Sequence, residues 1–202
     1  DRNGQGAPSF LLQENPEWKG NYKVKYWKPA WQAIVLNNLD EILEQGFDGA
    51  WLDLVDAFEH FEEDDGKWID HRRNPETGRS YRADMDAWVK RLAKHARTKR
   101  PDFLIVPQNG FQLLEDKEYA ELIDAAAVED LFTNGRRRQP VKEQRYVLSF
   151  LKKLPAGKPT LAIEYGRKPD VRRYSIEQAA QHGFTLLLTD RNLKTLGGQT
   201  AE

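Results

Sequence analysis

Residues 46–58, GFDGAWLDLVDAF, place a short apolar run directly before an acidic side chain. A glycine-flanked turn leads into Ala50, Trp51 and Leu52, and the run stops at Asp53. A run of this length, bounded by turn residues and preceded by a helical pattern, predicts a buried parallel strand. A carboxylate at the end of such a strand is costly to bury, so its presence indicates a specific structural or functional role. Asp53 is therefore a candidate catalytic group, and the alternative is an aspartate that caps the following turn.

Three later apolar runs also end at acidic or amide side chains. They are 103–107 before Gln108 and Asn109, 125–128 before Glu129 and Asp130, and 160–163 before Glu164 and Tyr165. Parallel strands of one barrel share a direction, so their carboxyl ends lie on the same face. Active sites of α/β barrels are built on that face. The four runs together therefore predict one cleft lined by acidic and amide groups.

Strand-like and helix-like patterns alternate along the chain, which predicts a parallel α/β fold. The helical patterns cover 31–43, 81–100, 111–122 and 146–151 and resume at 175, and a separate strand is expected at 22–27. Five barrel-type strands are expected, beginning near Ala50, Phe103, Ala125, Thr160 and Phe184. An open doubly wound sheet is the alternative. Its nucleotide-binding forms have no support, because the sequence contains neither a GxGxxG after a strand nor a GxxxxGK[ST].

Length and composition narrow the possible functions. At 202 residues we expect a single domain, residues 1–202, although a complete eight-stranded barrel typically needs about 250 residues. A formal net charge of -1 gives no general attraction to nucleic acid or membranes, and no long apolar segment predicts a membrane span. The absence of cysteine excludes disulfides, thiolate metal sites and a cysteine nucleophile. No HExxH spacing occurs, so we expect no metal and no other cofactor.

Five motifs in order carry a resemblance to a known family. They are ENPEWKGNYKVKYWKPAWQ, GFDGAWLDLVDAF, FLIVPQNG, AAAVEDLFTNG and LAIEYG. Between Phe10 and Asp190 the chain resembles the family 114 glycoside hydrolases, among them secreted TIM-barrel proteins once labelled cysteinyl-tRNA-synthetase-related. The resemblance implies a (β/α)8 TIM barrel that lacks its first strands in this chain. It also implies a secreted or cell-envelope protein.

The resemblance implies an activity and a catalytic pair. A retaining, endo-acting hydrolase of α-linked, galactosamine-containing polysaccharide is expected, with Asp53 as nucleophile and Glu129 as general acid/base. Retention requires the two carboxyl groups to lie about 5 Å apart, whereas inversion requires roughly 6.5 to 9.5 Å. The alternative is a carbohydrate-binding protein on a barrel scaffold that catalyses nothing.

Further residues are candidates for binding the sugar polymer. Strand ends contribute Asp56, Asn109, Glu164 and Tyr165, and the segment around 22–27 contributes Asn21, Tyr22 and Trp27. Amide and carboxylate groups can hold sugar hydroxyls or an amino group. For the strand-end residues, hydrogen bonding between neighbouring loops is an equal alternative. The three arginines at 136–138 lack interleaved aromatic residues and do not indicate a nucleic-acid site. The sequence does not predict an oligomeric state.

Overall fold

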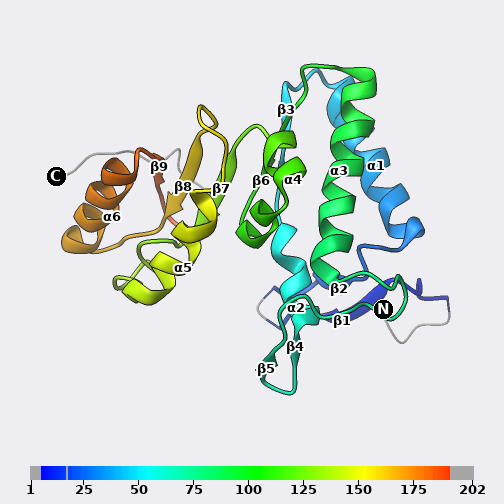
Figure 1. The fold of residues 1–202 in the computed structure, drawn as a ribbon, viewed down its shortest axis with the longest axis horizontal. Coiled ribbons are helices and arrows are strands. Elements are labelled where there is room, and N and C mark those ends of the chain that lie inside the picture. Colours follow the sequence, from blue (N-terminus) through cyan, green and yellow to red (C-terminus); the bar gives the residue numbers. More distant parts are fainter. Residues whose placement is uncertain (1–5, 17, 192–202) are drawn as a thin grey trace. The chain divides into compact units, whose positions relative to one another are not determined.

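A computed structural model describes residues 6–16 and 18–191 of the chain. The chain forms two compact units (Figure 1). The first unit contains residues 1–48 and 61–103, and the second contains residues 49–60 and 104–202. The short helix α2 (Glu59–Glu62) begins in the second unit and ends in the first.

The first unit contains two long helices that lie side by side, α1 (Pro29–Glu44) and α3 (Tyr81–Lys99). The Asp40 carboxylate joins them by accepting from His95 Nε2 at 2.5 Å and from Lys99 Nζ at 2.7 Å. Proline at the first position of α1 suits a helix start. Ser80 is the N-cap of helix α3, and its hydroxyl accepts a hydrogen bond from the backbone N–H of Ala83.

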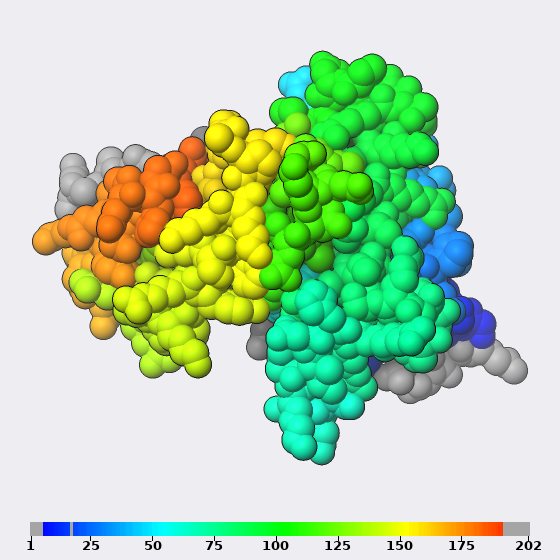
Figure 2. All heavy atoms as spheres, in the orientation of Figure 1, coloured from blue at the N-terminus to red at the C-terminus, as the bar shows by residue number. Residues whose placement is uncertain are grey.

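Two small hairpins complete the first unit. The strands β1 (Leu11–Glu14) and β2 (Tyr22–Val24) pair antiparallel, and β4 (Glu63–Asp64) pairs with β5 (Lys67–Trp68). The β4–β5 hairpin is the teal projection at the lower edge of the space-filling view (Figure 2). Its base is fixed by the fully buried Glu62, which forms a 2.8 Å ion pair with Arg82 of α3.

The second unit contains the parallel strands that the apolar runs predicted. They are β3 (Gly49–Leu52), β6 (Leu104–Pro107), β7 (Ala126–Glu129), β8 (Thr160–Glu164) and β9 (Thr185–Leu188). β3 pairs with β6, and β7, β8 and β9 pair in that order, all in parallel. An isolated parallel bridge between Gln108 and Ala127 connects the two groups. The α/β fold is therefore confirmed, and the described residues form no closed barrel.

Helices follow the strands of the second unit. The 3-10 helix η1 (Val55–Phe58) follows β3, and η2 (Phe111–Glu115) with α4 (Lys117–Leu122) follows β6. Helix α5 (Val141–Leu151) follows β7, and α6 (Pro169–His182) follows β8. Alternate residues Ile105, Val128 and Leu188 are fully or nearly fully buried, so one face of the strands contributes to the core.

Several element boundaries differ from the sequence-based expectations. No strand was expected at β1, because LLQE is short and its pairing with β2 is not visible in its own residues. The expected strand at 22–27 ends at Val24. Residues 59–80, for which no helix or strand was expected, contain α2 and the β4–β5 hairpin. Helix α6 begins at Pro169 rather than 175, because a proline at the first helical position replaces the serine start signal.

Gly49 allows close pairing of β3 with β6. A Cβ atom added at Gly49 would lie 2.6 Å from the Leu104 Cβ and 2.6 Å from the Leu104 carbonyl oxygen. Because the obstacle includes the backbone, a side chain here would force the two strands apart.

We predict that Gly49→Ala lowers the free energy of unfolding by about 1–3 kcal/mol through overpacking. Urea unfolding followed by circular dichroism measures this change. Ala180→Ser, which also adds one atom but at an exposed position of α6, serves as the control and should change stability by under about 0.5 kcal/mol. Equal stability of Gly49→Ala and the parent protein would contradict the packing argument.

Candidate active site

The pairing register decides which side chains share a face of the strands. Residues that pair across parallel strands point to the same side, and residues alternate sides along each strand. Trp51 pairs with Val106, Gln108 bridges to Ala127, and Glu129 pairs with Ile163. Each of these strands ends with a residue two positions after a paired one, and side chains two positions apart point to the same side. Four strand-end residues therefore lie on one face: Asp53, Gln108, Glu129 and Tyr165.

The Gln108 side chain connects the two predicted catalytic residues. Its Nε2 atom donates to Asp53 Oδ1 at 3.0 Å and to Glu129 Oε2 at 3.3 Å. Its Oε1 atom accepts from the indole Nε1 of Trp51 at 2.9 Å. The structure therefore brings Asp53 and Glu129 together around one buried amide.

Sequence reasoning noted Gln108 as a strand end but omitted it from the site. Its place at the end of β6, equivalent to Asp53 after β3, was the available signal. Trp51 was assigned only to the strand, although it lies two residues before Asp53 and therefore on the same face.

Three strand-end residues of the site are each followed by a residue in the left-handed conformation. Leu54 has φ 59°, Asn109 has φ 58° and Asp130 has φ 52°. Residues other than glycine seldom adopt this conformation, and such strain concentrates at functional sites. At Leu54 the turn directs the backbone N–H onto Asp53 Oδ1, at 2.8 Å.

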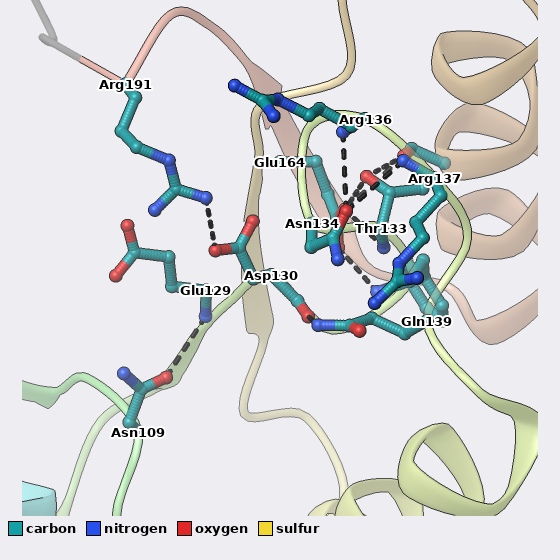
Figure 3. A network of polar contacts seen from close by, with 12 residues as sticks. Asn109, Glu129, Asp130, Thr133, Asn134, Arg136, Arg137, Gln139, Glu164 and Arg191 are labelled. Carbon is teal, nitrogen blue, oxygen red and sulfur yellow. Dashed lines mark hydrogen bonds and ion pairs between the residues drawn. The ribbon is translucent and has the colours of Figure 1, made fainter.

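Glu129 is held by groups from two neighbouring strands. Its backbone N–H donates to Asn109 Oδ1 at 3.1 Å (Figure 3). Its carboxylate accepts a hydrogen bond from the Tyr165 hydroxyl. Burial, followed by this hydrogen bond and the charge of Glu129, raises the pKa of Tyr165 well above its usual value, so the hydroxyl remains a donor.

Arg191 adds a positive charge beside Glu129. Its guanidinium lies 4.5 Å from the centre of the Tyr165 ring and forms a 2.5 Å ion pair with Asp130. Figure 3 shows the Arg191 side chain extending toward the carboxylates of Asp130 and Glu129. Asn109 and Tyr165, two of the predicted binding residues, thus contact the general acid/base candidate directly.

Asp56 lies in η1 beside Asp53. Burial raises the pKa of Asp56 to about 6, and the nearby charges of Glu59 and Asp53 add to this effect. A hydrogen bond from Asn109 acts in the opposite direction. Glu59 in turn accepts from Gln112 Nε2 at 2.7 Å, so this end of the site holds three neighbouring carboxyl groups.

The raised pKa of Asp56 predicts a pH-dependent stability. Because the folded protein binds this proton up to about pH 6 while the ordinary pKa is 3.8, the parent protein loses stability as pH rises between these values. Asp56→Asn removes this loss. The free energy of unfolding of the variant minus that of the parent should be about 1–3 kcal/mol larger at pH 7 than at pH 4. Urea unfolding at both pH values measures this gain, and a stability difference that does not change with pH would contradict the assignment.

Glu164 has a structural environment. Its side chain lies on the opposite face from Glu129, is fully buried, and accepts from the backbone N–H groups of Phe132 at 2.8 Å and Thr133 at 2.9 Å. The Thr133 hydroxyl donates at 2.6 Å, and Ser175 of α6 is a further donor at 3.4 Å. These contacts favour the alternative of hydrogen bonding between loops over sugar binding. Glu164 anchors residues 130–139, the loop drawn in Figure 3.

We predict that Glu164→Gln lowers the free energy of unfolding by about 2–4 kcal/mol, because an amide NH2 would face the donors of the loop. Chemical unfolding gives the energy, and amide hydrogen exchange at Phe132 and Thr133 localises the effect. Glu177→Gln at an exposed position of α6 is the matched control. Unchanged protection of both amides would contradict the anchoring role.

The remaining predicted binding residues, Asn21, Tyr22 and Trp27, belong to the first unit. Asn21 and Tyr22 are exposed at the start of β2. Trp27 donates from Nε1 to Glu76 at 2.9 Å and its ring lies 4.9 Å from that of Phe61. Lys25, Lys28 and Trp27 hydrogen bond to Glu76 and lower its pKa to about 2.

Residues 6–16 and 18–191 form neither a metal-binding cluster nor a membrane-spanning helix. No group of three or more histidine, aspartate or glutamate side chains in this part of the chain is arranged to hold a metal ion. No helix within it has the length and apolarity needed to cross a membrane.

The sequence profile of glycoside-hydrolase family GH114 matches residues 2–201. The chain belongs to this family. An uncharacterised protein of Deinococcus radiodurans is 37% identical over 193 residues, covering 95% of this chain and 58% of that protein. Uncharacterised proteins of Methanocaldococcus jannaschii and Thermotoga maritima are 36% and 35% identical, covering 80% and 79% of this chain and 45% and 47% of their own lengths. The chain thus spans about half the length of these relatives.

Two solved structures share the fold. The glycoside hydrolase domain of PelA from Pseudomonas aeruginosa has a TM-score of 0.66 and 22% identity, covering 90% of this chain and 68% of that one. Aspergillus fumigatus Ega3, in complex with galactosamine, has a TM-score of 0.66 and 18% identity, covering 92% and 66%. These two comparisons show that the chain shares its three-dimensional fold with both proteins.

Proposed function

We propose that the protein is a retaining, endo-acting glycoside hydrolase of an α-linked polysaccharide that contains galactosamine. Asp53 is the nucleophile and Glu129 is the general acid/base. The observation that carries the proposal is the Gln108 amide nitrogen shared by both carboxylates. Membership of a glycoside-hydrolase family supplies the reaction class.

The shared nitrogen limits the distance between the two carboxylates. Asp53 Oδ1 and Glu129 Oε2 lie 3.0 Å and 3.3 Å from the same atom. These two oxygens are therefore at most about 6.3 Å apart. This limit supports retention, since retaining enzymes place the carboxyl groups about 5–5.5 Å apart and inverting enzymes about 6.5–9.5 Å.

Each residue then has a defined role in a two-step reaction. Glu129 donates its proton to the glycosidic oxygen while Asp53 attacks the anomeric carbon, which breaks the bond to the leaving sugar and forms a glycosyl ester. Glu129, now ionised, removes a proton from water, and the resulting attack on the anomeric carbon releases Asp53. The Tyr165 hydroxyl and Arg191 stabilise the ionised form of Glu129 between the two steps.

Charge supports an amino sugar as substrate. Glu59 and Asp53 lie close enough to Asp56 for their charges to add to the burial that raises its pKa. A protonated sugar amine would offset this repulsion and find carboxylate acceptors at this end of the site. Asn109 and Tyr165 supply polar groups on the Glu129 side. Ega3, which shares the fold, was solved with galactosamine.

The architecture of the whole protein is also a proposal. The strands β3, β6, β7, β8 and β9 follow one another in chain order and in parallel, as consecutive strands of a (β/α)8 barrel do. We propose that residues 1–202 are part of one such catalytic domain. Secretion and a subsite at Asn21, Tyr22 and Trp27 are further proposals from the family resemblance.

The test is oligosaccharide release from partly deacetylated galactosaminogalactan by the full-length protein. Asp53→Asn and Glu129→Gln should each reduce cleavage by about 10²-fold or more while circular dichroism remains unchanged. The exposed changes Asp102→Asn and Glu177→Gln are matched controls that should retain parent activity. Mass spectrometry of the products distinguishes internal cleavage from release of monomers.

The stereochemical outcome is measured in the same reaction. Proton NMR during the first minutes should show the α-anomer of the new reducing end before mutarotation. Initial formation of the β-anomer would contradict retention. Glycan binding without cleavage by the parent protein would contradict the proposal and favour a carbohydrate-binding protein.

A further inference from the structure

We propose that Gln108 is a positioning residue whose amide, held in one orientation by Trp51, aligns both carboxylates and leaves Asp53 Oδ2 as the attacking atom. This inference rests on the proposed function and extends it to a residue that neither the catalytic pair nor the predicted binding set includes. Three features of the described residues carry it.

The orientation of the amide follows from the chemistry of its neighbours. The indole Nε1–H of Trp51 can only donate, so the atom 2.9 Å from it must be the amide oxygen of Gln108. The NH2 group must then face Asp53 and Glu129. In the opposite orientation two donors would meet at Trp51 and an oxygen would face two carboxylates. Trp51 thus excludes the wrong orientation of the amide.

The hydrogen bonds also distinguish the two oxygens of Asp53. Oδ1 accepts from the Leu54 backbone N–H at 2.8 Å and from Gln108 at 3.0 Å. Among the described residues, none donates to Oδ2. An oxygen that accepts two hydrogen bonds is the weaker nucleophile, because its lone pairs are engaged. Oδ2 is therefore the atom available to attack the anomeric carbon.

The shared NH2 group responds to the movement of charge in the reaction. Hydrogen bonds to an ionised acceptor are stronger than those to a neutral one. As Glu129 loses its proton to the leaving oxygen, its bond from Gln108 strengthens. As Asp53 becomes an ester, its own bond weakens. One amide with two hydrogens serves both carboxylates without rotating, which is the preorganisation that favours catalysis.

Other charged groups also face the pair. Asp56 lies beside Asp53, and Tyr165 and Arg191 face Glu129, with Asp130 paired to Arg191. All four groups are retained in the Gln108 variants. A shift of the pH profile in Gln108→Leu, which adds no titratable group, therefore reports the loss of the amide.

The experiment compares Gln108→Leu, Gln108→Glu and Trp51→Phe with the parent full-length protein on galactosaminogalactan. Gln108→Leu should reduce kcat by on the order of 10²-fold with KM changed by less than about threefold. Its acidic limb should move to higher pH, since a donor to the ionised carboxylates is gone. Gln108→Glu should be the least active of the three variants at neutral pH. It should recover part of its activity in acid, where the protonated glutamic acid can donate a hydrogen bond to a carboxylate.

Trp51→Phe keeps the amide but removes the indole N–H that fixes its orientation. The loss of kcat should therefore be smaller than in Gln108→Leu. Gln178→Leu on α6 and Trp18→Phe, exposed in the first unit, are matched controls that should behave as the parent. Parent cleavage with unchanged kcat and pH profile in Gln108→Leu would overturn the inference and leave the proposed function standing.

A second readout does not depend on hydrolysis. The Trp51 indole N–H resonance, assigned through Trp51→Phe, should shift upfield and exchange faster with water in Gln108→Leu. If the parent protein cleaves none of the glycans tested, the proposed function fails on its own. In that case an unchanged indole resonance overturns the inference, and a shifted one supports the locked amide.

Discussion

The parallel pairing register is the constraint on which the site depends. Each strand alternates its side chains between two faces, so a shift of one residue would send Glu129 to the buried face and bring Asp130 to its place. Gly49 contributes to this register at β3, where only a residue without a side chain fits against Leu104. The backbone pairing thus decides which side chains the proposed site contains.

The two faces carry different chemistry. On one face, Asp53, Gln108, Glu129 and Tyr165 form a connected polar group in which each carboxylate has a donor. On the other face, Glu164 also ends a strand as a carboxylate, but it is buried and accepts hydrogen bonds from the loop 130–139 and from Ser175 of α6. A carboxylate at a strand end can therefore belong either to the proposed site or to the structural core, depending on the face of the strands that it occupies.

Much of this arrangement could be predicted from the sequence. Short apolar runs that end in polar residues gave four of the five strands, the shared edge and the candidates Asp53 and Glu129. The sequence could not separate Glu164 from Glu129, because their faces depend on a register between strands distant in the chain. Gln108 was missed for a related reason, since its importance arises from Trp51, 57 residues earlier, and from the two carboxylates that it contacts. The hairpin in residues 59–80 was also not predicted, since its strands have two residues each.

We propose that Asp53 forms a covalent bond to the sugar while Glu129 transfers the proton. Trapping tests this claim most directly. The full-length protein would be incubated with a fluorinated galactosaminyl fluoride that slows release of the sugar, and then digested and sequenced by mass spectrometry. The proposed role of Asp53 predicts the added sugar mass on this residue, in the peptide that contains residues 49–56. Label on another residue, or hydrolysis of the reagent without any label and with inverted stereochemistry, would contradict it.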